Sequence, residues 1–158
     1  MHQLEEIIGY RFLDVNKLDK AMDSSILEND EYCNGAWGTI GDGLLHGLLG
    51  VRLLNESVAT KGDITEIRAN LENNDTQFAL IKGEGILDYG HNKKYFNDDE
   101  NIPDNEKPVS SSHNDYLEAI IAAIYYDGGY YCLKKWFDDY LYDLLKKYKV
   151  EKQNNEVE

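Results

Sequence analysis

The 158-residue sequence contains only two cysteines and two prolines. Cys33 and Cys132 lie far apart in the chain, so they form neither a zinc motif nor a disulfide framework, and we interpret them as idle thiols. No stretch approaches the length of an uncharged apolar membrane span, and the first ten residues carry Glu5 and Glu6 without a basic flank. These absences predict a protein that is neither secreted nor membrane-bound, and they favour the reducing cytoplasm.

Basic residues are also scarce, with 16 Lys and Arg against 30 Asp and Glu and a formal net charge of −14. A surface that binds nucleic acid unaided normally needs clustered Lys and Arg, which release counterions from phosphate. A chain this acidic therefore needs an additional source of positive charge to bind nucleic acid. Divalent cations such as Mg²⁺ can supply it, because they neutralise clustered carboxylates and bridge them to phosphate.

Segments that alternate apolar and polar residues, as strands do, are missing as well. Helical periodicity predicts a short helix ended by Gly9, a helix over about 15–22, two helices opened by Asp63-Ile-Thr-Glu66 and Asn74-Asp-Thr-Gln77, and a last helix over about 133–148. The fold class is therefore all-α.

The domain organisation follows from length and composition. Hydrophobic residues make up 42% of the chain, which is enough for one ordinary core. We predict a single domain over residues 1–148 and a polar, disordered tail over residues 149–158. Both prolines fall in a segment of about 88–112 that reads as a long inserted loop.

Carboxylates occur inside two otherwise apolar helices. The segment 115–126 is almost entirely apolar, and Asp127-Gly128-Gly129 predicts the end of its helix, since glycine can adopt the left-handed conformation found there. Its only acids are Asp115 and Glu118, three residues apart and so on one helix face. Asp42 is the sole acid of the apolar and glycine-rich stretch 39–51. A desolvated carboxylate must be paired, protonated or bound to metal, and its hard oxygens suit Mg²⁺ or Mn²⁺.

Structural alternatives remain for these and other polar residues. Asp115 could cap its helix, and Asp42 could pair with His46 one turn further on. Individual histidines are more often structural than catalytic, which we expect of the following three: His46, His91 and His113. We interpret four tyrosines as core or interface residues rather than as a base-stacking platform: Tyr125, Tyr126, Tyr130 and Tyr131.

Four segments, in order, resemble the catalytic domain of the ribonuclease III family. They are GYRF at 9–12, IGDGLL at 40–45, GDITEIRANL at 62–71 and DYLEAIIAAIYYDGG at 115–129, which are similar to the family's GY-x-F, LGDAVL, GDLSKLRAAL and DAFEALIGAIYLDGG. The resemblance extends from about Leu4 to Phe137. It implies the family's helical endonuclease fold, a symmetric homodimer, and hydrolysis of double-stranded RNA at a Mg²⁺ site that Mn²⁺ can also fill.

The resemblance also implies which residues form the site. The family holds Mg²⁺ with two acids of its signature helix and two of a later helix, and Asp42, Asp115 and Glu118 match three of these four. Asp42 and Glu118 are then the catalytic residues. The fourth acid is replaced, because Gly38 stands one turn before Asp42.

Two further departures concern other parts of the family pattern. A THRS-like stretch of the family is replaced by Asp23-Ser24-Ser25. The family's C-terminal double-stranded-RNA-binding domain has no counterpart in the sequence. We therefore expect that RNA affinity is weak, that a partner protein delivers the RNA, or that the sequence is a fragment.

Three functions compete on these observations. The first is a metal-dependent endoribonuclease in RNA processing, weakened by Gly38. The second is a non-catalytic ribonuclease III-like domain that dimerises or associates with RNA, and the third is an acidic protein-interaction module. Retention of Asp42, Asp115 and Glu118 favours the first, which we expect, whereas Gly38 favours the second. The third leaves the buried acids unexplained. We also predict a two-fold dimer through residues 37–54, where Gly38, Gly43, Gly47 and Gly50 allow close helix contact.

Overall fold

The computed structural model describes residues 2–25, 27–29, 31–91, 101–103 and 115–151 of the chain. Over these residues the structure is helical, and strand-like pairing is limited to one isolated bridge between Asp23 and His91. The elements are, in chain order, α1 (His2–Ile8), α2 (Val15–Ala21), α3 (Gly35–Asn55), α4 (Lys61–Glu72), α5 (Asn74–Gly83), the 3-10 turn η1 (Ile86–Tyr89), α6 (Asp115–Trp136), the π-helical turn η4 (Phe137–Leu141) and α7 (Tyr142–Lys147). The all-α prediction is confirmed.

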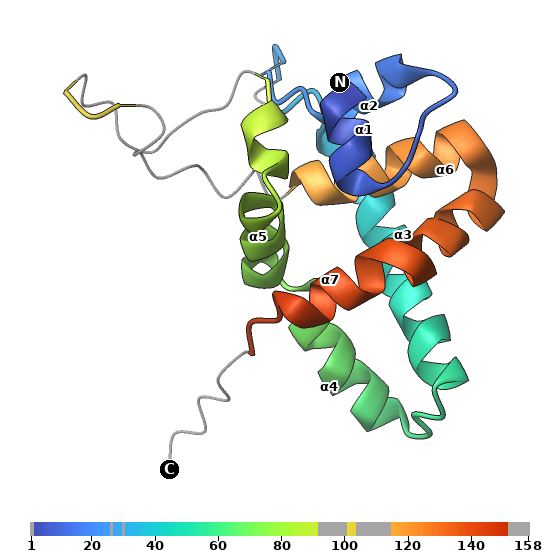
Figure 1. Cartoon of the computed structure of the whole chain (residues 1–158). Coiled ribbons are helices and arrows are strands. Elements are labelled where there is room, and N and C mark those ends of the chain that lie inside the picture. The colour runs from blue at the N-terminus through green and yellow to red at the C-terminus, as the bar shows by residue number, and fades with distance from the viewer. Residues whose placement is uncertain (1, 26, 30, 92–100, 104–114, 152–158) are drawn as a thin grey trace.

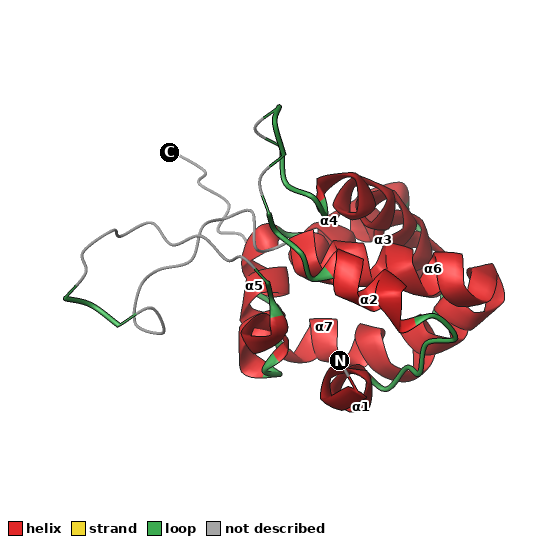
Figure 2. Ribbon diagram, turned by 90° about the horizontal axis from the view of Figure 1, so that it is seen from above, coloured by secondary structure: helices red, strands yellow, loops and turns green. Residues whose placement is uncertain are grey.

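The centre of the fold is the crossing of α3 and α6, which make the most extensive contact between any two helices (Figure 1). Every residue of α6 from Tyr116 to Ile124 is buried, as expected for a helix that is apolar on all faces. Helix α2 also packs against α6 (Figure 2). The two acids of α6 therefore lie at the start of the most deeply buried helix.

The two N-terminal helices agree with the sequence prediction. Helix α1 ends at Ile8, and Gly9 follows with a positive φ of 68°, a conformation that favours glycine. Helix α2 is capped by Asp14, whose side chain accepts a hydrogen bond from the Asn16 backbone N–H.

The predicted caps of α4 and α5 are wrong by a few residues. Helix α4 begins at Lys61 rather than at Asp63, because the Thr60 hydroxyl accepts the Asp63 backbone N–H at 3.1 Å. Helix α5 is capped by Asn73, whose side chain accepts the Thr76 backbone N–H at 2.8 Å. Both true caps are ordinary N-cap residues that stand just before the predicted ones.

Helix α6 bends where the sequence predicts its end. Gly129 has φ 80° and ψ 178°, an extended conformation accessible mainly to glycine rather than the left-handed helical one, and the chain then resumes as a helix to Trp136. The predicted last helix over 133–148 consequently comprises the end of α6, η4 and α7. At the bend, the fully buried Asp127 carboxylate accepts hydrogen bonds from the Tyr10 hydroxyl and two backbone N–H groups.

Most of the predicted loop over about 88–112 and of the predicted tail lies outside the described residues. The part of the tail that is described is anchored, since Val150 exchanges hydrogen bonds with Asn73 and Thr76. Among the described residues, no helix is both long enough and apolar enough to cross a membrane.

Candidate active site

Two glycines of α3 allow this helix to lie directly against the start of α6. A Cβ atom on Gly41 would fall 1.6 Å from the backbone oxygen of Glu118, so only glycine is compatible with this crossing. One turn earlier, a Cβ atom on Gly38 would lie 3.2 Å from the Cβ of Asp115. Asp42 follows Gly41 directly, so three acids from two helices gather around this close approach.

The three acids differ in exposure: Glu118 is only 9% exposed, Asp115 is half-buried and Asp42 is exposed. Burial raises the pKa of Glu118 to about 7; a hydrogen bond from Gln77 opposes this, and the charges of Asp42, Asp115 and Glu72 add to it. The pKa of Asp115 is raised first by burial and then by Asp42. Their mutual repulsion favours either a shared proton or a cation.

The carboxylates do not, however, surround a common point. Among the described residues, no three His, Cys, Asp or Glu side chains are arranged to hold a metal ion. The charges of Asp42 and Asp115 still reach Glu118, since both raise its pKa. The donor chemistry nevertheless fits Mg²⁺, which binds one or two carboxylates and completes its shell with water and phosphate oxygens.

Gln77 is part of this site and was not identified from the sequence, where residues 74–77 were interpreted only as a helix cap. Its side chain is fully buried in the first turn of α5, and its Nε2 donates to Glu118 Oε1 at 2.8 Å and to the Glu72 backbone oxygen at 2.9 Å. Its Oε1 has no hydrogen-bond partner among the residues that the structure describes. Such an unsatisfied buried acceptor costs about 1–3 kcal/mol. The sequence could have indicated Gln77 only as a polar residue on the same helix face as the apolar Leu80 and Ile81, which are buried.

Glu72, the last residue of α4, is a further acid next to the site. His46 Nδ1 lies 2.9 Å from the Glu72 carboxylate, and Arg68 Nε lies 4.0 Å from it. The expected alternative of an Asp42–His46 pair is therefore replaced by a His46–Glu72 pair between α3 and α4. Glu72 is charge-compensated by these neighbours, whereas Asp42 remains exposed to solvent.

Two of the three histidines are surface residues that pair with acids, in agreement with the expectation, and the four tyrosines divide between the core and the exposed surface. His46 and His91 are exposed and pair with acids, while His113 lies outside the described residues. Tyr125 is half-buried and packs against the core. The other three are exposed rather than in the core, by 56%, 49% and 79%, respectively: Tyr126, Tyr130 and Tyr131. Both cysteines are free.

Known proteins resemble this chain in both sequence and structure. Ribonuclease 3 of Brucella canis and of Brucella suis are each 30% identical to it over 141 residues, which cover 87% of this chain and 55% of theirs. The chain thus spans about half the length of these curated relatives. Two structures of the nuclease domain of ribonuclease III from Campylobacter jejuni superpose with a TM-score of 0.71 and 27% identity, covering 92–93% of this chain and 94–95% of theirs.

The family model of the ribonuclease III domain matches residues 36–129, which is more than half of the chain and includes all three acids of the site. The structural similarity covers the remaining helices too. The chain therefore belongs to the ribonuclease III domain family.

Proposed function

We propose that this chain is an endoribonuclease that hydrolyses double-stranded RNA with Mg²⁺ held by Asp42, Asp115 and Glu118. The observation that carries the proposal is the α3–α6 crossing at Gly41, which brings Asp42 to a buried Glu118 whose pKa is raised to about 7. Perturbed carboxylates of this kind are typical of functional sites. Family membership supports the reaction class, and the metal accounts for how an acidic chain approaches phosphate.

Each acid has a distinct part in this proposal. Bound Mg²⁺ would supply Lewis-acid activation of water and stabilise charge on the phosphodiester oxygens. Glu118 would hold the cation as an ionised carboxylate from a buried position on α6. Asp42 would contribute from the exposed side of α3, and Asp115 from the first turn of α6.

The residue at position 38 affects how tightly the site would bind the metal ion. A side chain there would start against Asp115, so a carboxylate at this position would point to the same cation. Glycine supplies no ligand, and more water must complete the metal's coordination shell. We therefore expect slow cleavage that needs high concentrations of Mg²⁺ or Mn²⁺.

The test is cleavage of long double-stranded RNA titrated with Mn²⁺, using folded preparations of three variants and the wild type. Glu118→Gln should abolish activity, and Gly38→Glu should raise it at low metal after a shift of a few tenths of an ångström at Asp115. Asn55→Glu adds the same charge at the exposed far end of α3 and should change nothing. If neither wild type nor Gly38→Glu cleaves RNA at any metal concentration, the chain is instead a non-catalytic member of its family.

The same proposal includes a two-fold homodimer. Trp37, Ile40 and Tyr126 border an apolar pocket of about 340 Å³, and Ile40 and Tyr126 are 43% and 56% exposed. A second copy is the occupant that we propose, since one of the Campylobacter jejuni structures concerns a region involved in dimer formation of that nuclease domain. Of the four glycines named in the predicted interface, Gly43 and Gly47 face open space, as an interface requires.

The other two glycines of that prediction serve the monomer. Gly38 packs against Asp115, and a Cβ atom on Gly50 would lie 3.4 Å from the Arg68 guanidinium. Two of the four glycines therefore contact other residues of the same chain, and only Gly43 and Gly47 are free to contact a second copy.

A further inference from the structure

The Gln77 side-chain amide connects the candidate metal site to two neighbouring helices by hydrogen bonds. Gln77 lies on α5, while Glu118 lies on α6, and their side chains meet at 2.8 Å without access to solvent. The amide also donates to the backbone oxygen of Glu72, where α4 ends. One side chain thus joins three helices at the buried acid.

The orientation of this amide is determined by its neighbours. Both partners of Nε2, the Glu118 carboxylate and the Glu72 carbonyl, are acceptors, so a reversed amide would set its oxygen against two oxygens. In the observed orientation Oε1 has no partner within the described part of the chain. Buried polar atoms are rarely left without a hydrogen bond. The amide keeps this orientation although Oε1 is unpaired, because the two bonds donated by Nε2 require it.

We propose that Gln77 is a positioning residue that holds Glu118 in the orientation needed to bind the divalent cation. This inference rests on the proposed function, because it assigns Gln77 a role toward the same metal site. The donated bond takes Glu118 Oε1 and orients the carboxylate plane, while the bond to the Glu72 backbone prevents the amide from rotating with it. Partners of this kind behind a metal ligand set its orientation and basicity.

The hydrogen bond from Gln77 to Glu118 also offsets the loss of a fourth metal-binding acid at Gly38. A site with three acids in place of four depends more strongly on each remaining ligand, and Glu118 is the most buried of the three. A carboxylate that must turn before it binds loses side-chain entropy on binding. A carboxylate already held by Gln77 has lost that freedom on folding.

The test compares Gln77→Met, which keeps the approximate volume and removes the donor, with Thr76→Val as a matched control. Thr76 is also fully buried on α5 and also bonds to the α4 backbone, but it does not contact Glu118. We expect Gln77→Met to weaken Mn²⁺ binding by about 10-fold in isothermal titration calorimetry, and to lower kcat while leaving KM for RNA unchanged. Thr76→Val should lower the melting temperature and leave Mn²⁺ affinity unchanged.

A measurement on the wild-type chain avoids any dependence on how the variants fold. In an NMR titration with Mg²⁺ alone, the Gln77 side-chain amide signals should shift with the same concentration dependence as the Glu118 backbone amide. Signals of Gln77 that stay fixed while those of Glu118 move would overturn the positioning role.

Glu118→Gln distinguishes failure of this inference from failure of the proposed function. If Glu118→Gln loses Mn²⁺ binding and Gln77→Met binds Mn²⁺ as wild type does, the positioning role is wrong and the metal site stands. If Glu118→Gln binds Mn²⁺ as wild type does, the metal site itself is wrong, and the positioning role with it.

Discussion

At Glu118, burial and neighbouring carboxylates raise the pKa to about 7 from an ordinary value of 4.5. The folded, metal-free chain therefore retains a proton that the unfolded chain releases. The stability from this group is complete below its unfolded pKa and is lost as pH rises through its folded pKa, by about 3 kcal/mol in total. We expect the melting temperature in EDTA to fall between about pH 5 and about pH 8, and Glu118→Gln to reduce this dependence.

Addition of Mg²⁺ provides the control for that experiment. At about pH 8 the cation should stabilise the wild-type chain, because it binds the folded state and compensates the ionised carboxylates, and it should do little for Glu118→Gln. A wild-type stability curve as flat as that of the variant would contradict the raised pKa.

Gly41 is the residue on which the helix crossing depends. Gly41→Ala would put a methyl group 1.6 Å from the Glu118 carbonyl, so α3 and α6 must separate. We expect a loss of more than about 4 kcal/mol in the free energy of unfolding, or no folded protein. Gly62→Ala, in the exposed first turn of α4 and also facing open space, should instead raise stability by about 0.5 kcal/mol. Urea denaturation of both variants measures the contrast, and similar stabilities would refute it.

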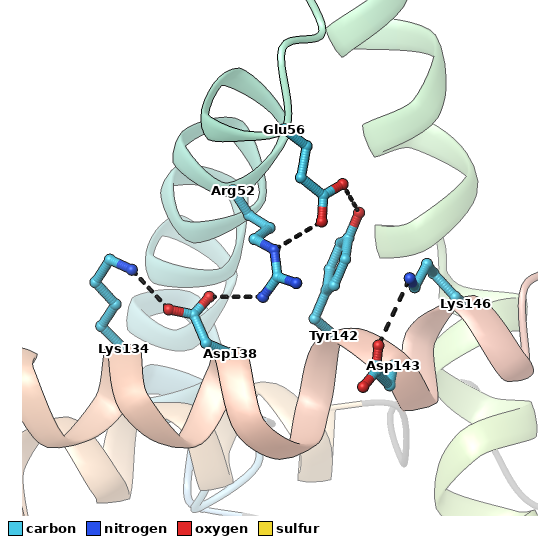
Figure 3. Close-up of polar contacts among 7 residues, drawn as sticks. All are labelled: Arg52, Glu56, Lys134, Asp138, Tyr142, Asp143 and Lys146. Carbon is cyan, nitrogen blue, oxygen red and sulfur yellow. Dashed lines mark hydrogen bonds and ion pairs between the residues drawn. The ribbon is translucent and has the colours of Figure 1, made fainter.

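At the scale of elements, a polar network joins the end of α3 to the C-terminal helices (Figure 3). Arg52 Nε donates to Glu56 at 2.8 Å, its Nη1 donates to Asp138 at 3.1 Å, and its guanidinium lies 4.4 Å from the centre of the Tyr142 ring. Tyr142 in turn donates to Glu56 at 2.9 Å. Lys134 supplies a second cation to Asp138 at 2.6 Å. The network connects α3, η4 and α7 at the end of α3 away from the acids.

The charges of this network predict an acid-sensitive contribution to stability. The hydrogen bond from Arg52 is the main cause of the lowered pKa of Glu56. Burial tends to raise the pKa of Asp138, but the hydrogen bonds from Lys134 and Arg52 outweigh it and lower this pKa. Groups with lowered pKa stabilise the fold above their ordinary pKa, and this stability is lost as pH falls through the folded value.

Arg52→Met tests this contribution. We expect a loss of about 1 kcal/mol at neutral pH, because the network is partly solvent-exposed and the cation–π contact is also lost. The difference from wild type should shrink toward about pH 3, because falling pH removes the charges of these carboxylates. Chemical denaturation at both pH values measures it, and a difference that does not change with pH would mean that packing rather than charge is responsible.

At the scale of the whole molecule, the exposed apolar face beside Trp37 predicts self-association. Ile40→Asp should shift the chain from dimer to monomer in sedimentation experiments, because it places a charge in the centre of the proposed interface. Ile67→Asp is the matched control, since Ile67 is also a partly exposed apolar residue, at 36%, but lies on α4. A wild-type chain that stays monomeric at micromolar concentration would refute the dimer.

Much of the architecture could be predicted because it depends on local spacing. The 3.6-residue periodicity predicted the helices, Gly9 marked the end of α1, and the glycines after Asp127 marked the bend in α6. The caps of α4 and α5 were misplaced because several adjacent Asn, Asp and Thr residues are equally good N-caps by type. Only backbone geometry selects Thr60 and Asn73 among them.

The sequence by itself determined that this chain is helical, strongly acidic and carries acids in apolar helices, because composition and local periodicity do not depend on tertiary contacts. Tertiary structure decided which residues meet across helices. It brought Gly41 against Glu118, gave Glu118 the amide of Gln77 and gave His46 the partner Glu72. These contacts join residues 26 to 77 positions apart, and they depend on the angle and distance at which packed helices cross, which no local pattern encodes.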